Sequence, residues 1–229
     1  MQIVIGVCRE RVAYWEHTDS VEAAERFVIQ RGAATGKIVD SPTYIHLGRE
    51  RIVNIFLEQT RASHLCFVDS DNTLPPEAFW ALAQRDLPIV GATYFGRRKF
   101  FPPDVIAKKW VDGGPYSRSI NKKLRETVLE YDLPIKPQPQ YIESAPLLTV
   151  DVIGFGCLMI QREVLETLSE KYTHIFGGHG EIGEDACFCM HAQNEGYKIY
   201  LDLGVQLGHL RIDEVTIANF MAIQEWVET

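Results

Sequence analysis

Two carboxylates separated by one residue, in Asp69-Ser70-Asp71, are the first feature of this sequence that could do chemistry. They follow residues 64–68, an apolar run with the length of a buried strand. Carboxylates at a strand end can direct oxygen atoms at one hard cation, and Mg²⁺ and Mn²⁺ prefer oxygen ligands that they often share with substrate phosphates. Because Asp, Ser and Asn also favour turns, these residues alone fit a metal site and a simple turn equally well.

The same residues also fit a phosphatase mechanism. Residues 67–74 are similar to the apolar strand and DxDxT signature of haloacid dehalogenase-type phosphatases, in which the first aspartate, here Asp69, is the nucleophile. That mechanism also needs a Ser or Thr at the end of the next strand, where Thr93 could serve, and an acidic pair that closes a later strand. Glu184-Asp185 instead follows a glycine-rich loop and begins a predicted helix, so a phosphatase stays the alternative.

The elements that must position these residues alternate between strand and helix. Apolar runs predict strands at 3–8, 37–39, 64–68 and 88–93, and apolar residues at helical spacing predict helices at 21–30 and 49–60. Pro75-Pro76 predicts the start of a further helix that ends near Arg85. This order predicts an α/β fold with a mostly parallel central sheet, helices on both faces, and ligands at the carboxyl ends of the strands.

The second half of the chain begins with weaker regularity. Proline and glycine signals between residues 97 and 146 predict a long functional insertion or flap. Strands are then expected at 148–153 and 157–160, around Gly154-Phe155-Gly156, and at 197–201. Helices are expected at 162–172, at 184–196, where Gly196 ends the helix, and at 213–227.

Positive charge is concentrated in residues 97–125. Nine Lys or Arg residues stand against two Asp residues, a balance of +7 that leaves −15 for the rest of a chain whose net charge is −8. Such a segment could steer an anionic acceptor, with aromatic side chains for sugar rings or bases to stack on. A solvated loop with one or two residues near a diphosphate would explain the same composition.

Composition narrows the function classes. A net charge of −8 and a pI near 5.4 argue against a protein that coats nucleic acid or anionic membrane with its whole surface. No apolar run approaches the roughly 20 residues of a spanning helix, and we expect a cytoplasmic protein with one domain over residues 1–229. Five cysteines without CxxC spacing favour reduced, buried thiols over a zinc site.

Three blocks of the sequence resemble the glycosyltransferases of the GT-A fold, particularly the compact family 2-like enzymes. Residues 49–98, from RERIVN to IVGATYFGRR, are similar to that family's helix, strand, DxD and second strand. The segment VIGFGCLMIQREVLETL is similar to its glycine-rich acceptor strand and helix, and GEDACFCMHAQNEGYKIYLDLGVQLGH to its final block. The resemblance implies a single GT-A domain with a nucleotide-sugar half at 1–96, the insertion at 97–146 and a catalytic half at 147–229.

The resemblance also implies roles for individual residues. Asp69 and Asp71 would be the DxD pair that binds Mn²⁺ or Mg²⁺, with Asp71 the more direct ligand and His209 completing the metal shell. Asp185 would be the base that takes a proton from the acceptor hydroxyl, with Glu184 beside it. The residues expected to contact the nucleoside-diphosphate sugar, for example a UDP-sugar, are Cys8, Arg9, Asp40, Arg49, Asp69, Ser70, Asp71, Gly154 and Gly156.

Two features depart from that family. Glu50 stands where asparagine usually follows the arginine at position 49, and the first strand ends in Gly6-Val7-Cys8-Arg9 rather than in a Pro-Thr type turn. We expect a metal-dependent transfer of a sugar to a hydroxyl of a glycan, a lipid-linked acceptor or a nucleic acid. The alternatives are the phosphatase and a non-catalytic module that binds nucleotide sugars.

Overall fold

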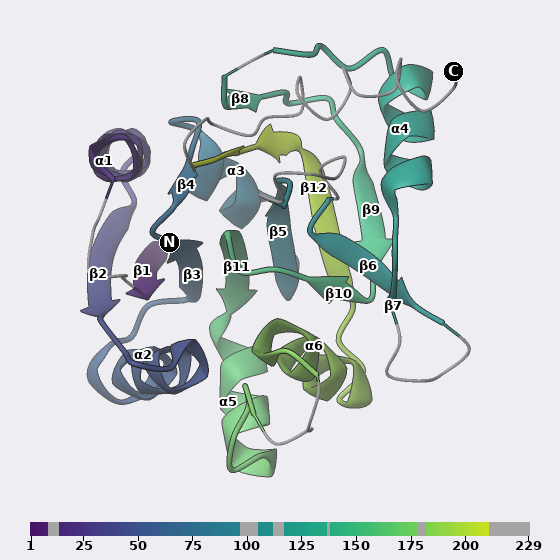
Figure 1. Ribbon diagram of the computed structural model, residues 1–229. Helices are drawn as coiled ribbons and strands as arrows, with labels where there is room; N and C mark the ends of the chain where they lie inside the picture. Colours follow the sequence, from purple (N-terminus) through teal and green to yellow (C-terminus); the bar gives the residue numbers. More distant parts are fainter. Residues whose placement is uncertain (9–13, 97–104, 112–116, 137, 178–181, 211–229) are drawn as a thin grey trace.

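The expected alternation of strands and helices is present in the first part of the chain (Figure 1). The structure is a computed structural model that describes residues 1–8, 14–96, 105–111, 117–136, 138–177 and 182–210. Two helices begin earlier than the apolar spacing indicated, because their first turns are largely polar or exposed. The elements are β1 (Gln2–Cys8), α1 (Trp15–Gln30), β2 (Ala34–Asp40), α2 (Ile45–Gln59), β3 (His64–Asp69), β4 (Asn72–Thr73), α3 (Ala78–Gln84) and β5 (Ile89–Thr93).

The segment 97–146 contains regular structure that its turn signals concealed. Its described part forms β6 (Ala107–Trp110), β7 (Ser117–Ser119), α4 (Asn121–Glu130) and β8 (Gln140–Tyr141). Leu124 and Val128 are buried one helical turn apart on α4, where Lys, Arg and Glu neighbours hide the apolar spacing. The loop-rich character expected for this segment is therefore wrong for these residues, whereas its role as an insertion or flap stays a prediction. Residues 97–104, 112–116 and 137 lie outside the described part.

The last part of the chain follows the expected order. Gly196 adopts φ +85° just after α6, which confirms its predicted role at the helix end. The terminal helix expected at 213–227 falls outside the described residues. The elements here are β9 (Leu147–Val150), β10 (Val152–Ile153), β11 (Cys157–Gln161), α5 (Arg162–Lys171), α6 (Glu184–Asn194), β12 (Ile199–Gln206) and β13 (Gly208–His209).

The central sheet is mixed, with strand order β2-β1-β3-β11-β5-β12-β8, and β9 pairs with β12. β1 runs parallel to β2 and β3, and β12 runs parallel to β5, whereas β11 is antiparallel to both β3 and β5. Strands β1, β2, β3, β5 and β12 therefore point the same way, which confirms the predicted mixed, mostly parallel sheet. Register aligns Cys8 with both Asp40 and Asp69, so these three residues end neighbouring strands at one edge of the sheet.

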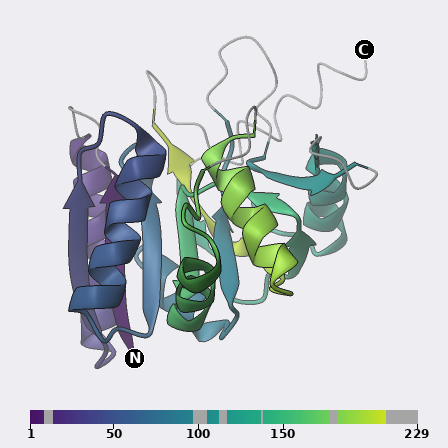
Figure 2. The same ribbon diagram turned by 90° about the horizontal axis from the view of Figure 1, so that it is seen from below.

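Helices cover both faces of this sheet, as Figures 1 and 2 show. α1 and α3 pack on one face through a cluster that includes Val21, Val28 and Phe79. α2, α5 and α6 pack on the other face through a cluster that includes Phe56, Leu168 and Phe188. No described helix combines the length and apolarity needed to cross a bilayer.

Candidate functional site

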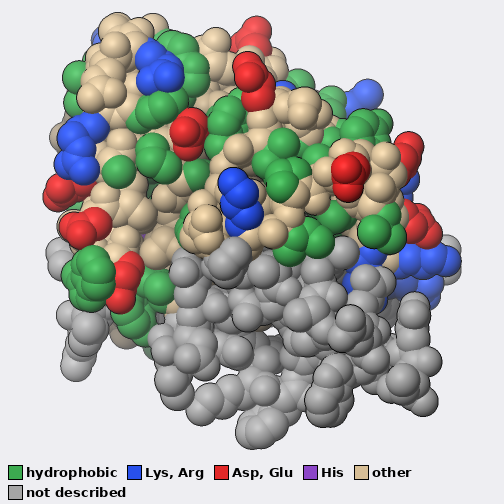
Figure 3. All heavy atoms as spheres, turned by 90° about the horizontal axis from the view of Figure 1, so that it is seen from above, with side chains coloured by type: hydrophobic (Ala, Val, Ile, Leu, Met, Phe, Trp, Pro, Cys, Tyr) green, Lys and Arg blue, Asp and Glu red, His purple; other side chains and the backbone are tan. Residues whose placement is uncertain are grey.

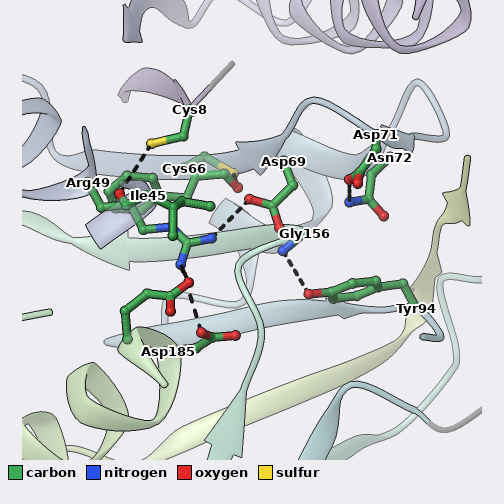
Figure 4. A network of polar contacts seen from close by, with 12 residues as sticks. Cys8, Ile45, Arg49, Cys66, Asp69, Asp71, Asn72, Tyr94, Gly156 and Asp185 are labelled. Carbon is green, nitrogen blue, oxygen red and sulfur yellow. Dashed lines mark hydrogen bonds and ion pairs between the residues drawn. The ribbon is translucent and has the colours of Figure 1, made fainter. Parts of the chain in front are cut away.

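Residues from distant parts of the sequence meet at the carboxyl edge of the sheet (Figure 4). A cavity of about 300 Å³ opens there, between the ends of β1, β3 and β5 and the start of α6. It brings together six of the predicted site residues with three hydrophobic or aromatic residues. Its lining consists of Cys8, Ile45, Asp69, Ser70, Asp71, Tyr94, Ile106, Asp185 and His209.

Arg49 lies beside this cavity as a buried cation. Its side chain is 2% exposed, its Nη1 donates to Glu184 Oε1 at 2.8 Å, and its Nη2 donates to Asp69 Oδ1 at 3.0 Å. The guanidinium also lies 4.3 Å from the centroid of the Phe155 ring. Burial alone would lower the pKa of Arg49, but the carboxylates of Asp69, Asp185 and Glu184 outweigh burial and raise it. Arg49 was expected near the nucleotide or its phosphates, which stays a prediction; in this structure its guanidinium is hydrogen bonded to carboxylates of the protein.

The three residues expected to bind metal are only partly brought together. Asp71 Oδ2 lies 3.4 Å from His209 Nε2, whereas Asp69 Oδ1 is turned to Arg49. Over the described ranges, no three His, Cys, Asp or Glu side chains form a group arranged to hold a metal ion. The expected set of Asp69, Asp71 and His209 is therefore reduced to a pair in this structure.

The tautomer of His209 is fixed by the backbone. Its Nδ1 lies 2.7 Å from the carbonyl oxygen of Phe95, and because a carbonyl only accepts, Nδ1 must carry the hydrogen. Nε2, the other ring nitrogen, then faces the Asp71 carboxylate. Metal-binding histidines commonly have their other ring nitrogen fixed in this way.

Asp185 and Glu184 occupy the first turn of α6 but have different surroundings. Glu184 is hydrogen bonded to Arg49, while Asp185 lines the cavity with a side chain that is 33% exposed and lies 3.9 Å from Arg49 Nη1. Burial is the main cause that raises the pKa of Asp185 to about 6; Arg49 opposes the rise, and Glu184 and Asp69 add to it. A carboxyl group with this pKa is ionised at neutral pH and is a better base than an ordinary aspartate.

Gly154 and Gly156 leave room for the ring of Tyr94. A Cβ atom at Gly154 would lie 2.1 Å from the Tyr94 hydroxyl oxygen, and one at Gly156 would lie 2.6 Å from the ring carbon that bears it. The backbone N–H of Gly156 donates to that hydroxyl at 3.0 Å. Close approach of a sugar or acceptor to these glycines stays a prediction, and the structure shows that both also make room for Tyr94. Tyr94 was not predicted as a site residue, although its place just after β5 is a strand-end position like that of Asp69.

The phenol of Tyr94 lies near both acidic positions of the site. Burial first, and then the charges of Asp69 and Asp185, raise the pKa of Tyr94 well above its ordinary value. The hydroxyl group therefore stays protonated across the physiological range.

The other nucleotide contacts expected from the sequence are engaged within the protein or lie outside the described residues. Burial is the main cause that raises the pKa of Cys8 to about 12, so its thiol is protonated. Asp40 accepts a hydrogen bond from Arg51 Nε at 2.9 Å. Arg9 lies outside the described ranges. The unusual Glu50 accepts a hydrogen bond at 3.0 Å from the backbone N–H of Phe176, so it holds the chain that leads into α6.

Ser70 also borders a second, smaller cavity. This cavity of about 140 Å³ lies between α1 and the ends of β1 and β2, and it is lined by Val7, His17, Thr18, Val21, Lys37, Val39 and Ser70. The buried His17 donates from Nδ1 to the carbonyl oxygen of Asn72 at 2.9 Å. Burial lowers the pKa of His17, which keeps its ring neutral. The apolar spacing did not reveal this histidine because it precedes the predicted helix.

Two described residues of the basic segment lie far from Asp185. Lys109 pairs with Asp151 at 3.0 Å, and Trp110 Nε1 donates to Gln193 Oε1 at 2.8 Å, at the end of α6 opposite Asp185. Both line a separate cavity of about 590 Å³. On the face shown in Figure 3, acidic and basic side chains are scattered among hydrophobic and other residues. Arg97, Arg98 and Lys99 lie outside the described residues, so steering of an anionic acceptor stays a prediction.

Comparisons with known proteins identify the fold. The crystal structure of A197 from STIV matches over 92% of this chain and 86% of its own, with a TM-score of 0.57 and 16% sequence identity. The crystal structure of GalNAc-T7 with UDP, GalNAc and Mn²⁺ matches over 92% of this chain and 43% of its own, with a TM-score of 0.54 and 10% identity. The chain shares its fold with these two structures. No protein-family model and no curated sequence matches it.

Proposed function

We propose that this protein transfers a sugar from a nucleoside-diphosphate sugar to an acceptor hydroxyl. One observation carries the proposal: a single cavity at the carboxyl edge of the sheet is lined by Asp71 and His209, which suit a cation, and by Asp185, which suits a base. The shared fold with GalNAc-T7, whose structure contains UDP, GalNAc and Mn²⁺, supports it. Fold alone does not decide function, so the chemistry of the cavity is the main argument.

Asp71 and His209 are the residues that would hold Mn²⁺ or Mg²⁺. Their 3.4 Å separation is close to the distance of about 3 Å between neighbouring ligands that each lie about 2.1 Å from one octahedral ion. The fixed tautomer of His209 leaves Nε2 free to bind a metal, and a carboxylate beside an imidazole is an acceptable ligand set for Mn²⁺. A bound cation supplies positive charge that stabilises a leaving diphosphate.

Asp185 is the proposed base. It lines the cavity, and its raised pKa leaves it ionised yet able to accept a proton from an acceptor hydroxyl at neutral pH. Glu184 is hydrogen bonded to Arg49 and is absent from the residues that line this cavity. We therefore assign Glu184 a positioning role, in which it fixes the first turn of α6 through Arg49.

The phosphatase alternative has less support. Its nucleophile would be Asp69, but Asp69 is hydrogen bonded to the buried Arg49. Thr93, which would have to contact a phosphate, donates its hydroxyl to the carbonyl oxygen of Asp202 at 2.8 Å. A non-catalytic binding module is disfavoured by the position of Asp185 in the cavity.

A panel of nucleotides tests the proposal directly. UDP, GDP, ADP and CDP and their common sugar conjugates are titrated with Mn²⁺, and binding is followed by thermal shift and calorimetry. We expect one nucleoside diphosphate to stabilise the protein only with the metal, and Asp71→Asn to abolish that effect. Absence of binding and of donor hydrolysis across the panel would refute the proposal, and phosphate release from p-nitrophenyl phosphate that Asp69→Asn abolishes would favour the phosphatase.

A further inference from the structure

Tyr94 lines the cavity and carries a buried hydroxyl group. The residue is 4% exposed, and it directly follows β5 at the same sheet edge as Asp69. The ring is fixed from two sides: Gly154 and Gly156 lie against it, and the His209 ring meets it edge to face with 5.5 Å between centroids. Figure 4 shows the hydroxyl directed at Gly156 below Asp69.

One hydrogen-bonding capacity of this hydroxyl is unused. A phenol donates one hydrogen and accepts through its oxygen. The N–H of Gly156 occupies the oxygen at 3.0 Å, and within the described part of the chain no group accepts the hydroxyl hydrogen. A buried donor without a partner is unfavourable, so a ligand oxygen in the cavity would gain an interaction that the protein does not satisfy itself.

We propose that the Tyr94 hydroxyl binds the sugar of the donor by donating a hydrogen bond to one of its hydroxyl oxygens. This inference rests on the proposed function. In a sugar transfer, the sugar must lie between the leaving diphosphate and the acceptor hydroxyl. Tyr94 contacts His209, which belongs to the proposed cation and diphosphate position, and shares the cavity with Asp185, the proposed base for the acceptor.

The fixed position of the ring makes Tyr94 a specificity residue. Because the glycines and His209 confine the ring, the hydroxyl cannot move to follow a differently shaped sugar. Sites that hydrogen bond a substrate hydroxyl discriminate against analogues that lack it, since a buried polar group is then left unpaired. Donors that carry an oxygen at the matching ring position should be preferred over their deoxy analogues.

Binding measurements with one altered atom on each side test the proposal. Calorimetry with Mn²⁺ compares wild type, Tyr94→Phe and the matched control Tyr197→Phe, whose hydroxyl contacts Thr167 instead of the cavity. Ligands are the nucleoside diphosphate, its sugar conjugate and a series of deoxy-sugar conjugates. We expect Tyr94→Phe to weaken binding of the sugar conjugate about five- to tenfold, the effect of losing one neutral hydrogen bond. Binding of the nucleoside diphosphate should be unchanged. One deoxy donor should bind wild type and Tyr94→Phe equally, and Tyr197→Phe should behave as wild type.

Each outcome separates this inference from the proposed function. If wild type binds no nucleoside diphosphate or conjugate, the proposed function fails and this inference falls with it. If wild type binds the conjugate but Tyr94→Phe binds it equally well, or weakens both ligands equally, the inference alone is overturned. If Tyr94→Phe is unstable, the deoxy series on wild type still tests the inference. At least one deoxy donor should bind wild type about fivefold more weakly than the full donor, and if none does, the inference is overturned.

Discussion

Arg49 Nη2 lies 3.0 Å from Asp69 Oδ1, and the same guanidinium reaches Glu184, although the arginine side chain is 2% exposed. Removal of one partner from a buried ion pair leaves charge without compensation. We predict that Arg49→Met lowers the free energy of unfolding by about 3–5 kcal/mol, measured by urea denaturation.

The neighbouring Arg51 provides the control for that experiment. It also pairs with an aspartate, Asp40, but its side chain is 51% exposed. Exposed pairs contribute about 1 kcal/mol or less, so Arg51→Met should change stability only slightly. Equal effects of the two substitutions would show that Arg49 is an ordinary surface cation.

Loss of the imidazole should weaken metal binding. We predict that His209→Ala weakens Mn²⁺ binding at least about tenfold, because loss even of a residue that only supports a metal ligand commonly lowers metal affinity about tenfold or more. Electron paramagnetic resonance of free Mn²⁺ measures this. His64→Ala is the matched control, because His64 is also buried but begins β3, at the opposite end of the strand from Asp69. Unchanged Mn²⁺ affinity in His209→Ala would remove His209 from the site.

Activity should depend on the ionisation of Asp185. Its pKa near 6 predicts that kcat/KM rises with pH through that value and then levels off, because only the carboxylate accepts a proton. Asp185→Asn should lower kcat by about 10²–10⁴ and remove this step, whereas Asp151→Asn, near the far end of α6, should keep it. If kcat/KM of Asp185→Asn still rose near pH 6, that rise would belong to another titrating group.

The same shift affects stability with a defined sign. The pKa of Asp185 is higher in the folded state than its ordinary 3.8, so the folded state binds the proton more tightly. Its contribution to stability is complete below pH 3.8 and is lost as the pH rises to about 6. The free energy of unfolding, measured by urea denaturation from pH 3.8 to about 6, should decline less in Asp185→Asn than in wild type.

The glycines against Tyr94 should not tolerate a methyl group. We predict that Gly156→Ala costs about 1–3 kcal/mol of stability through overpacking, because its Cβ would lie 2.6 Å from the tyrosine ring. Gly36→Ala is the control: a Cβ there meets Val4 at an ordinary 3.7 Å. In the Tyr94→Ala background the cost of Gly156→Ala should disappear, and a cost that persists would contradict this explanation.

The sequence predicted the central fold because its elements have strong local signals. The buried strand before Asp69 and the apolar spacing of α2 are properties of single segments, and the structure confirms them. β6, β7 and α4 were not predicted because nearby prolines and glycines imply loops. Leu124 and Val128 become interpretable only when the core they pack against is known.

Side-chain partners were less predictable than elements. Asp71 and His209, which were predicted to share a metal ion, lie 3.4 Å apart. Nothing in the sequence shows that Arg49 is hydrogen bonded to Asp69 and Glu184. The glycines at 154 and 156 were identified without the tyrosine that requires them. Arg49 and Asp69 are 20 positions apart, and the other contacts join residues 60 or more positions apart, so all of them depend on how the sheet is assembled.

The position of β11 links the two parts of the polypeptide physically. It comes from the later part of the chain but inserts between β3 and β5, both from the earlier part. A fragment ending before β11 would leave β3 and β5 without the strand that joins them, and a fragment containing only the later part would lack both neighbours of β11. Cleavage between the two parts should therefore yield pieces that fold by complementation rather than separately, and the cavity residues would be assembled only in the reconstituted pair.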